Sequence, residues 1–127
     1  GTNAVFNHFF KQGHGKIVNV SSIAGKIVMS GPSACSATNF AVNAISEGTR
    51  KESAGAIQVT CIMPGICATE LANTTTDNAA METLKQLEMA TVARPAAEVA
   101  ESIKFALEQD QGLSINEMTL RPTQQET

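Results

Sequence analysis

The 127-residue chain contains no tyrosine and no tryptophan, so five phenylalanines and two histidines are its only aromatic side chains. Any mechanism that needs a phenol as a proton donor or acceptor must therefore do without one. The chain also has no run of the roughly 20 apolar residues that cross a bilayer. Its amino terminus lacks the basic-then-apolar order of a signal peptide. We expect a soluble protein with no membrane partner.

Basic charge is also sparse. Nine lysines and arginines stand against twelve acidic residues, which gives a net charge of −3 at pH 7 and no basic cluster. We therefore expect no nucleic-acid partner, because phosphate neutralisation has no obvious source. Cys35, Cys61 and Cys67 show neither zinc-site spacing nor a disulfide framework, which favours a reducing, cytoplasmic location. His8 and His14 have no metal-ligand spacing either, so we expect two surface imidazoles and no metal.

Hydrophobic residues make up 43% of the chain, enough for the core of one domain over residues 1–127. Apolar spacing and β-branched runs predict its elements. We expect helices at Thr2–Lys11, at Ala34–Ser53 and from Pro95 to before Gly112, and strands at Lys16–Ser21, Ile57–Met63 and Ser114–Leu120. Residues 66–78 are predicted to be a mobile loop before a weak short helix, and residues 121–127 a loose tail.

The predicted elements alternate between helix and strand along the whole chain. This order indicates an α/β protein with a parallel sheet built from right-handed crossovers. Phe40 lies on the small and apolar stripe of the second helix, together with Ala37, Ala41, Ala44, Ile45 and Gly48. We expect this stripe to pack against the sheet or a partner helix, which would bury Phe40.

Several short motifs follow one another in a specific order. They are Lys16-Ile-Val-Asn-Val-Ser-Ser22, Ala24-Gly25, Ser36-Ala37-Thr38, Pro64-Gly65 with Thr69, and Ser114-Ile-Asn-Glu-Met-Thr-Leu-Arg-Pro122, which contains the final strand. Together they resemble the landmarks of short-chain dehydrogenases/reductases over essentially the whole chain. The resemblance implies a partial doubly wound, Rossmann-like parallel sheet of about three strands with flanking helices. No Gly-x-x-x-Gly-x-Gly segment follows a strand, so we expect the amino-terminal dinucleotide-binding half to be absent.

The same resemblance implies where catalytic groups would lie. Ser22 matches the family's catalytic serine, whose hydroxyl binds a substrate carbonyl or alcohol. The family's Tyr-x-x-x-Lys motif places a phenol and an ammonium on one helix face, where the ammonium lowers the phenol pKa and binds the cofactor ribose. Cys35 and Asn39 stand at these two positions. Both departures remove chemistry, because neither a phenol nor a cation remains.

A cofactor loop is implied in the same way. Pro64, Gly65, Ile66 and Thr69 resemble the family's nicotinamide-side loop, in which backbone groups and the threonine hydroxyl contact the carboxamide or phosphate. NAD(P) is thus the cofactor by resemblance, although we expect this chain to bind none. Each site residue also has a simpler interpretation. Ser22 would cap a turn, Cys35 would be a small buried helix residue, and the Pro-Gly pair would end a strand.

The leading hypothesis for function is an inactive remnant of an NAD(P)-dependent carbonyl or alcohol oxidoreductase. The alternative is a structural or interaction module that keeps only the family's association surfaces, and a third is one piece of a split enzyme. The helices at 2–11 and 34–53 resemble the family's subunit interface, and the strand at 16–21 would leave an open edge. We expect a homodimer or higher homo-oligomer, formed by edge pairing, helix packing or an exchanged element.

Overall fold

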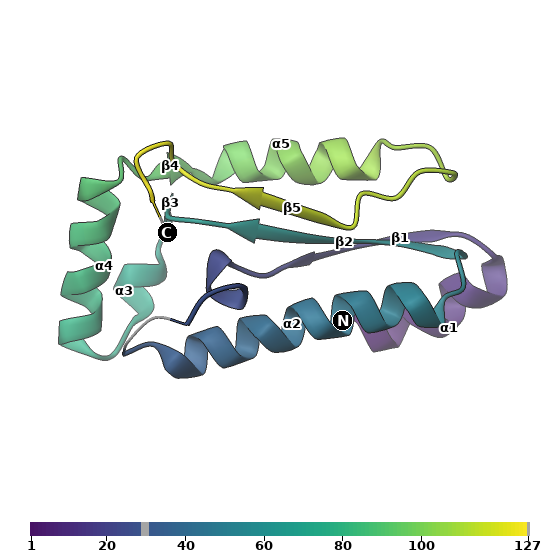
Figure 1. Ribbon diagram of the computed structural model, residues 1–127, viewed down its shortest axis with the longest axis horizontal. Coiled ribbons are helices and arrows are strands. Elements are labelled where there is room, and N and C mark those ends of the chain that lie inside the picture. Colours follow the sequence, from purple (N-terminus) through teal and green to yellow (C-terminus); the bar gives the residue numbers. More distant parts are fainter. Residues whose placement is uncertain (29–30, 127) are drawn as a thin grey trace.

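The computed structural model of the protein describes residues 1–28 and 31–126 (Figure 1). Its elements are α1 (Thr2–Gln12), β1 (Gly15–Val20), the short 3₁₀ helix η1 (Ile23–Gly25), α2 (Ser33–Glu52), β2 (Ile57–Pro64), β3 (Cys67–Ala68), α3 (Leu71–Thr74), α4 (Asn78–Ala90), β4 (Arg94–Pro95), α5 (Ala96–Leu107) and β5 (Glu117–Leu120). All the predicted helices and strands are present, which confirms the α/β class.

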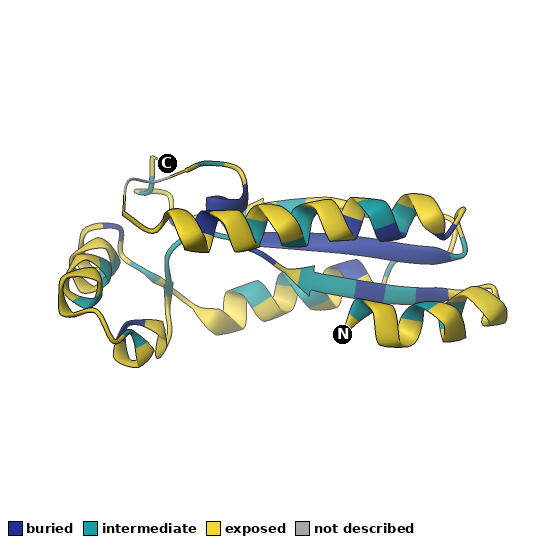
Figure 2. Cartoon of the chain, turned by 90° about the horizontal axis from the view of Figure 1, so that it is seen from below, coloured by how far each residue is buried: buried dark blue, intermediate teal, exposed yellow. Residues whose placement is uncertain are grey.

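Three parallel strands form the main sheet in the order β1-β2-β5. The central strand β2 is buried from Ile57 to Met63, as expected for a parallel strand that is covered on both faces (Figure 2). Its β-branched and apolar residues favour the extended conformation, and Pro64-Gly65 ends it because proline cannot donate to the ladder. A separate parallel pair, β3 and β4, lies beyond the sheet.

Helices cover both faces of the sheet. Figure 1 shows α1 and α2 on one face and α5 on the other. Alternate strand residues confirm this, since Cys61 donates to Asn43 of α2 whereas Gln58 donates to Asp110 just after α5. Both connections step across the sheet in the same direction, β1 to β2 and β2 to β5, but from opposite faces. They therefore have opposite hands, and the prediction that every crossover is right-handed is wrong. The α5 crossover covers a face that would otherwise lie open.

The apolar core lies between α1 and the sheet. Phe6 and Phe9 pack against Ile17, Ile57 and Val59 of β1 and β2. Gly13 ends α1 in the left-handed conformation with φ of 77°, which glycine adopts without a steric penalty. The turn therefore reverses the chain, so that β1 packs against Phe6 and Phe9 of α1.

Helix α2 packs with its polar side inward. Its three buried residues are Ser36, Ser46 and Thr49. Asn19 Nδ2 of β1 donates to Ser46 Oγ at 2.9 Å. The Cys61 thiol of β2 likewise donates to Asn43 of α2. Thr49 Oγ1 instead donates within the helix to the backbone oxygen of Ile45, and Ser36 Oγ has no hydrogen-bond partner among the described residues.

The apolar stripe predicted for α2 consequently points outward. Phe40 is 42% exposed and Ile45 is 54% exposed. Figure 2 shows this outer side of α2 as largely exposed. The prediction that the stripe packs on the sheet is wrong within this chain, because hydropathy alone did not reveal that polar strand residues would select the opposite helix face.

The loop after α5 is anchored from the sheet. Lys16 Nζ donates to the backbone oxygens of Leu107, at 2.7 Å, and Gln109. Gln58, its register partner on β2, donates to the backbone oxygens of Asp110, at 2.6 Å, and Leu113. Leu107 is the last residue of α5, so its carbonyl is one that the helix end leaves unpaired, and the other three acceptors lie in the loop beyond it. They fix the segment that leads into β5.

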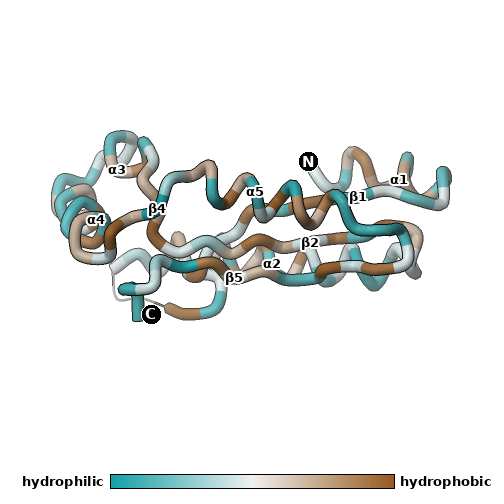
Figure 3. The backbone as a smooth tube through the Cα atoms, turned by 90° about the horizontal axis from the view of Figure 1, so that it is seen from above, coloured by the Kyte–Doolittle hydropathy of each residue, from teal (hydrophilic) through white to brown (hydrophobic). Residues whose placement is uncertain are grey.

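Several segment boundaries differ from the sequence prediction. The helix predicted to continue to just before Gly112 ends at Leu107. β5 begins at Glu117 and not at Ser114. Arg94 and Pro95 form β4, so α5 begins one residue later at Ala96. The segment predicted as a loop contains β3 and α3, and Figure 3 shows α3 and α4 together at one end of the molecule. No helix among the described residues is long and apolar enough to span a bilayer.

Ile62 tests the importance of the central strand, because its side chain has no exposed surface. We predict that Ile62→Ala lowers the free energy of unfolding by about 2–5 kcal/mol, since it removes buried methyl groups and leaves a cavity. Met89→Ala, on the exposed surface of α4, is the matched control and should change it by less than about 0.5 kcal/mol. Urea denaturation measures both, and equal small changes would contradict the burial of β2.

Candidate functional site

The residues predicted to form a site lie where the parallel strands end. Ser22 comes two residues after β1, and Pro64-Gly65 closes β2. Carboxyl ends of neighbouring parallel strands meet at one edge of a sheet, where α/β proteins bind their ligands. The structure brings two of these residues together, because Ser22 Oγ lies 3.5 Å from the backbone oxygen of Pro64 and donates to it.

The Ser22 hydroxyl also has a structural partner. Its oxygen accepts the backbone N–H of Ala24 at 3.1 Å and so caps η1. Ser22 itself is half-buried, whereas η1 is fully covered by α2 and β2. The turn-capping role is therefore present, and it holds the hydroxyl oxygen at the strand end in a fixed position.

Cys35 and Asn39 lie one helical turn apart in the first part of α2. Asn39 Nδ2 donates to the backbone oxygen of Cys35 at 2.9 Å and lies 3.5 Å from Cys35 Sγ. Ser21 Oγ donates to the backbone oxygen of Asn39 at 3.2 Å, which ties this turn to the end of β1. Cys35 is exposed, so its interpretation as a buried helix residue is wrong. The adjacent Ser36 is buried, so the exposure of Cys35 reflects the side of α2 on which it lies.

Thr69 belongs to the segment that leaves β3. Its hydroxyl oxygen accepts the backbone N–H of Leu71 at 3.3 Å, at the start of α3. No side-chain hydrogen bond joins Thr69 to Ser22 or Cys35 among the described residues. The structure thus brings Ser22 and the Pro-Gly turn together and uses the Thr69 hydroxyl for a local helix start.

The carboxy-terminal segment closes over the Pro64-Gly65 turn. Gly65 N–H donates to the backbone oxygen of Leu120 at 2.6 Å. Ile66 N–H donates to the side-chain oxygen of Gln125 at 2.9 Å. The prediction of a loose tail is therefore wrong for Gln125. Sequence reasoning missed this residue because a lone glutamine in a polar tail carries no periodic or motif signal.

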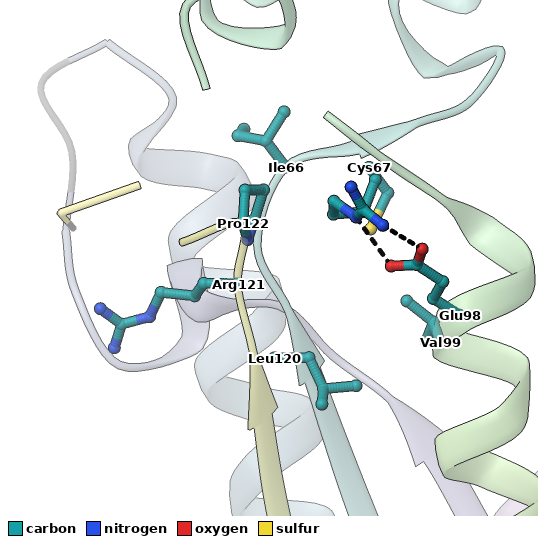
Figure 4. A pocket seen from close by; sticks show the side chains of 8 residues that line it. Ile66, Cys67, Glu98, Val99, Leu120, Arg121 and Pro122 are labelled. Carbon is teal, nitrogen blue, oxygen red and sulfur yellow. Dashed lines mark hydrogen bonds and ion pairs between the residues drawn. The ribbon is translucent and has the colours of Figure 1, made fainter. Parts of the chain in front are cut away.

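A cavity of about 140 Å³ lies beside this turn (Figure 4). It is lined by Ile66, Cys67, Arg94, Glu98, Val99, Leu120, Arg121 and Pro122. The Arg94 guanidinium donates to both carboxylate oxygens of Glu98, with Nε to Oε2 at 2.9 Å. This hydrogen bond raises the pKa of Arg94 and lowers the pKa of Glu98. The remaining lining is mainly apolar, so the cavity offers a small hydrophobic surface together with the Arg94–Glu98 ion pair.

A second cavity, of about 210 Å³, lies between α2 and β5. It is lined in part by Glu47, whose carboxylate accepts hydrogen bonds from Arg50 and forms an ion pair with Lys51. These partners lower the pKa of Glu47 to about 2. Burial raises the pKa of the Cys61 thiol on its floor. No cluster of three or more metal-binding side chains occurs in residues 1–28 and 31–126.

The fold and the arrangement of these residues match a known family. The profile of the family described as short chain dehydrogenase matches residues 1–80. The chain therefore belongs to the short-chain dehydrogenase family.

Individual relatives agree with this assignment. An uncharacterized oxidoreductase of Staphylococcus saprophyticus is 34% identical, over 98% of this chain and 51% of the relative. Human dehydrogenase/reductase SDR family member 11 is 33% identical, over 89% of this chain and 45% of its own length. The closed form of a serine dehydrogenase complexed with NADP⁺ superposes with a TM-score of 0.88 at 28% identity, over 99% of this chain and 51% of that chain. The chain thus spans about half the length of these relatives.

The groups at the turn do not fit a nicotinamide nucleotide in the arrangement described. Ile66 N–H is bonded to Gln125, and the space above Gly65 Cα holds the Gln125 side chain, with which an added Cβ would collide. The Thr69 hydroxyl binds Leu71, and Asn39 carries no charge for a ribose. Each contact group therefore already has an intramolecular partner or lacks the needed chemistry.

The three cysteines should differ in reactivity. We predict that iodoacetamide at pH 8 modifies exposed Cys35 first, half-buried Cys67 more slowly and buried Cys61 last. Burial limits access and raises the pKa of the Cys67 and Cys61 thiols, which leaves less of the reactive thiolate. Peptide mass spectrometry over time measures the order. In guanidinium chloride all three should react alike, and folded Cys61 reacting as fast as Cys35 would contradict the structure.

Proposed function

We propose that this chain is a short-chain dehydrogenase homologue that does not itself catalyse hydride transfer, and that the ancestral reaction was NAD(P)-dependent interconversion of a carbonyl and an alcohol. The observation that supports the proposal is the pair at the start of α2, where Cys35 and Asn39 stand at the positions that the family resemblance assigns to the motif's tyrosine and lysine. Of the family's serine, tyrosine and lysine, this chain retains the serine, as Ser22.

The chemistry of the pair supports the proposal. A cysteine side chain is several ångströms shorter than a tyrosine, so its thiol does not reach where a phenol would meet a substrate oxygen. An asparagine amide is neutral and neither lowers a neighbouring pKa nor holds a ribose through a charge. Asn39 instead donates to the backbone oxygen of Cys35. The face that would carry an acid and a cation carries a thiol and an internally bonded amide.

The cofactor side supports the same proposal. The 127 residues include no Gly-x-x-x-Gly-x-Gly segment to cradle a pyrophosphate. The turn at Pro64–Ile66 is engaged by Leu120 and Gln125 of the same chain. A nicotinamide would have little to hold it in near-attack geometry, and we propose that the chain binds NAD(P) weakly or not at all.

Restoring the tyrosine and the lysine together tests whether the lost cofactor contacts are enough to prevent turnover. We predict that the double variant Cys35→Tyr, Asn39→Lys shows no oxidation of NADPH or NADH above background with a panel of aldehydes and ketones. The physical reason is that two restored side chains do not supply the missing cofactor contacts. Cofactor absorbance measures turnover, and fluorescence titration of the reduced cofactor measures binding. Turnover by the double variant, or saturable tight binding by the natural chain, would refute the proposal.

A second function is favoured by the outward face of the two helices on one side of the sheet. Val5 and Phe10 of α1 and Phe40 and Ile45 of α2 are all exposed. Exposed apolar side chains on neighbouring elements mark association surfaces. We propose that this face mediates homodimerisation, so that the chain acts as an interaction module. Helix packing is favoured over edge pairing because the exposed aromatic residues lie on helices and not on β1.

The oligomeric state tests this surface directly. We predict that sedimentation equilibrium at micromolar concentration gives about twice the 13.3 kDa monomer mass. Phe40→Asp with Ile45→Asp should return the mass to the monomer, because two carboxylates would be desolvated in the interface. Met89→Asp, at an 82% exposed residue of α4, should leave the dimer intact. A natural chain at monomer mass with no concentration dependence would rule out the module.

A further inference from the structure

The segment that joins α5 to β5 buries little apolar surface. We call this segment, residues 108–116, the strap; it contains no helix and no strand. No residue from 108 to 120 is buried, and Leu113 of the strap is 57% exposed. β5 itself alternates between exposed and half-buried residues. Segments with few buried apolar contacts open before the rest of a protein, so the strap needs other contacts to hold it.

Hydrogen bonds from two strand side chains supply those contacts. The Lys16 ammonium donates to the last backbone oxygen of α5 and to one at the start of the strap. The Gln58 carboxamide donates to two backbone oxygens within the strap. Hydrogen bonds from an ammonium are roughly twice as strong as neutral ones, and Lys16 is half-buried. Lys16 is therefore the main contact that keeps the strap closed.

Gln58 also opposes the closed arrangement. Its residue is 7% exposed, and its side-chain oxygen is buried without a hydrogen-bond partner among the described residues. A buried acceptor that is left unpaired destabilises the state that buries it. Opening the strap would return this oxygen to water. The closed strap is thus stabilised by Lys16 and destabilised by the Gln58 oxygen.

The end of the strap forms one wall of the cavity between α2 and β5. Asn116 of the strap and Glu117 of β5 line this cavity of about 210 Å³, together with the Cys61 thiol. Cys61 N–H donates to the backbone oxygen of Asn116 at 2.9 Å. Lys26 Nζ also reaches Glu117 Oε2, at 3.0 Å, but these side chains are 44% and 57% exposed, and such surface pairs add little. Movement of the strap would therefore open the cavity.

We propose that the strap is a gate to this cavity. Residues 108–117 leave the sheet together, the Lys16 ammonium is the catch that keeps them closed, and opening gives small molecules access to the Cys61 thiol. The gate goes beyond the proposed loss of hydride transfer and the proposed dimer, because it uses neither a cofactor nor a second copy.

Backbone amide exchange measured by NMR on the full natural chain tests the opening. The Leu113 and Cys61 amides report on the strap, and the Ser21 amide, bonded to the backbone oxygen of Ile62, reports on the β1–β2 pair. After correction for intrinsic rates, the first two should exchange at least about tenfold faster than Ser21. Their urea dependence should be weaker, because a partial opening exposes less surface than unfolding. A Cys61 amide that matches Ser21 in rate and urea dependence would overturn the proposal.

Lys16→Met tests the catch, because it keeps the apolar stem and removes the ammonium. It should raise exchange at Leu113 and Cys61 by roughly tenfold or more. Lys26→Met is the matched control and should raise it by no more than about threefold. Equal responses to the two variants, or no rise in Lys16→Met, would show that Lys16 is not the catch. The natural-chain measurement still decides whether the strap opens if Lys16→Met does not fold.

Iodoacetamide measures access to the cavity in the same proteins, with exposed Cys35 as the internal reference. Lys16→Met should raise the rate of Cys61 modification, relative to Cys35, by the same factor as exchange of the Cys61 amide. Lys26→Met should raise it by no more than about threefold. A Cys61 thiol whose rate does not follow its amide would show that the strap does not gate the cavity. These readouts involve neither turnover nor oligomeric mass, so they are separate from the tests of the proposed function.

Discussion

The rest of the structure depends on the burial of one strand. β2 pairs with β1 on one side and β5 on the other, and every residue from Ile57 to Met63 is removed from solvent. Such burial requires a cover on both faces, which explains why α5 crosses on the side opposite α1 and α2. The Pro-Gly pair that ends β2 then sets where the chain leaves the sheet. Ser22 lies against that strand end and η1 packs beside it.

The polar contact between α2 and the sheet has two effects at once. Hydrogen bonds from Asn19 and Cys61 fix the rotation of the helix about its axis. This rotation places the turn with Cys35 and Asn39 beside the end of β1, where Ser21 contacts it. It also leaves Phe40 and Ile45 facing outward. The geometry of the motif positions and the apolar outer surface are consequences of the same interface.

The sequence predicted the elements well and their contacts less well. Residues that end helices and strands, such as Gly13 and Pro64-Gly65, together with β-branched runs, located the elements to within a few residues. The inward face of α2 was not predictable, because hydropathy assumes an apolar partner and the sheet presents polar groups there. The position of Gln125 was not predictable either, since a single bond spanning 59 residues leaves no local pattern. The family motifs located Ser22 and Pro64-Gly65 at the ends of two strands, and the structure added that these ends meet and which of their groups are already bonded.

The anchors on the loop after α5 bear on the order in which the chain assembles. Lys16 and Gln58 come from two different strands and reach the loop across 91 and 52 residues of sequence. Neither lysine nor glutamine is in place until β1 and β2 are paired in register. The β1–α2–β2 unit has the shorter loops to close and can form without β5, whereas β5 needs a surface that this unit creates. We therefore expect β5 to join the sheet last, and a register slip between β1 and β2 would displace the anchors of the loop that leads into it.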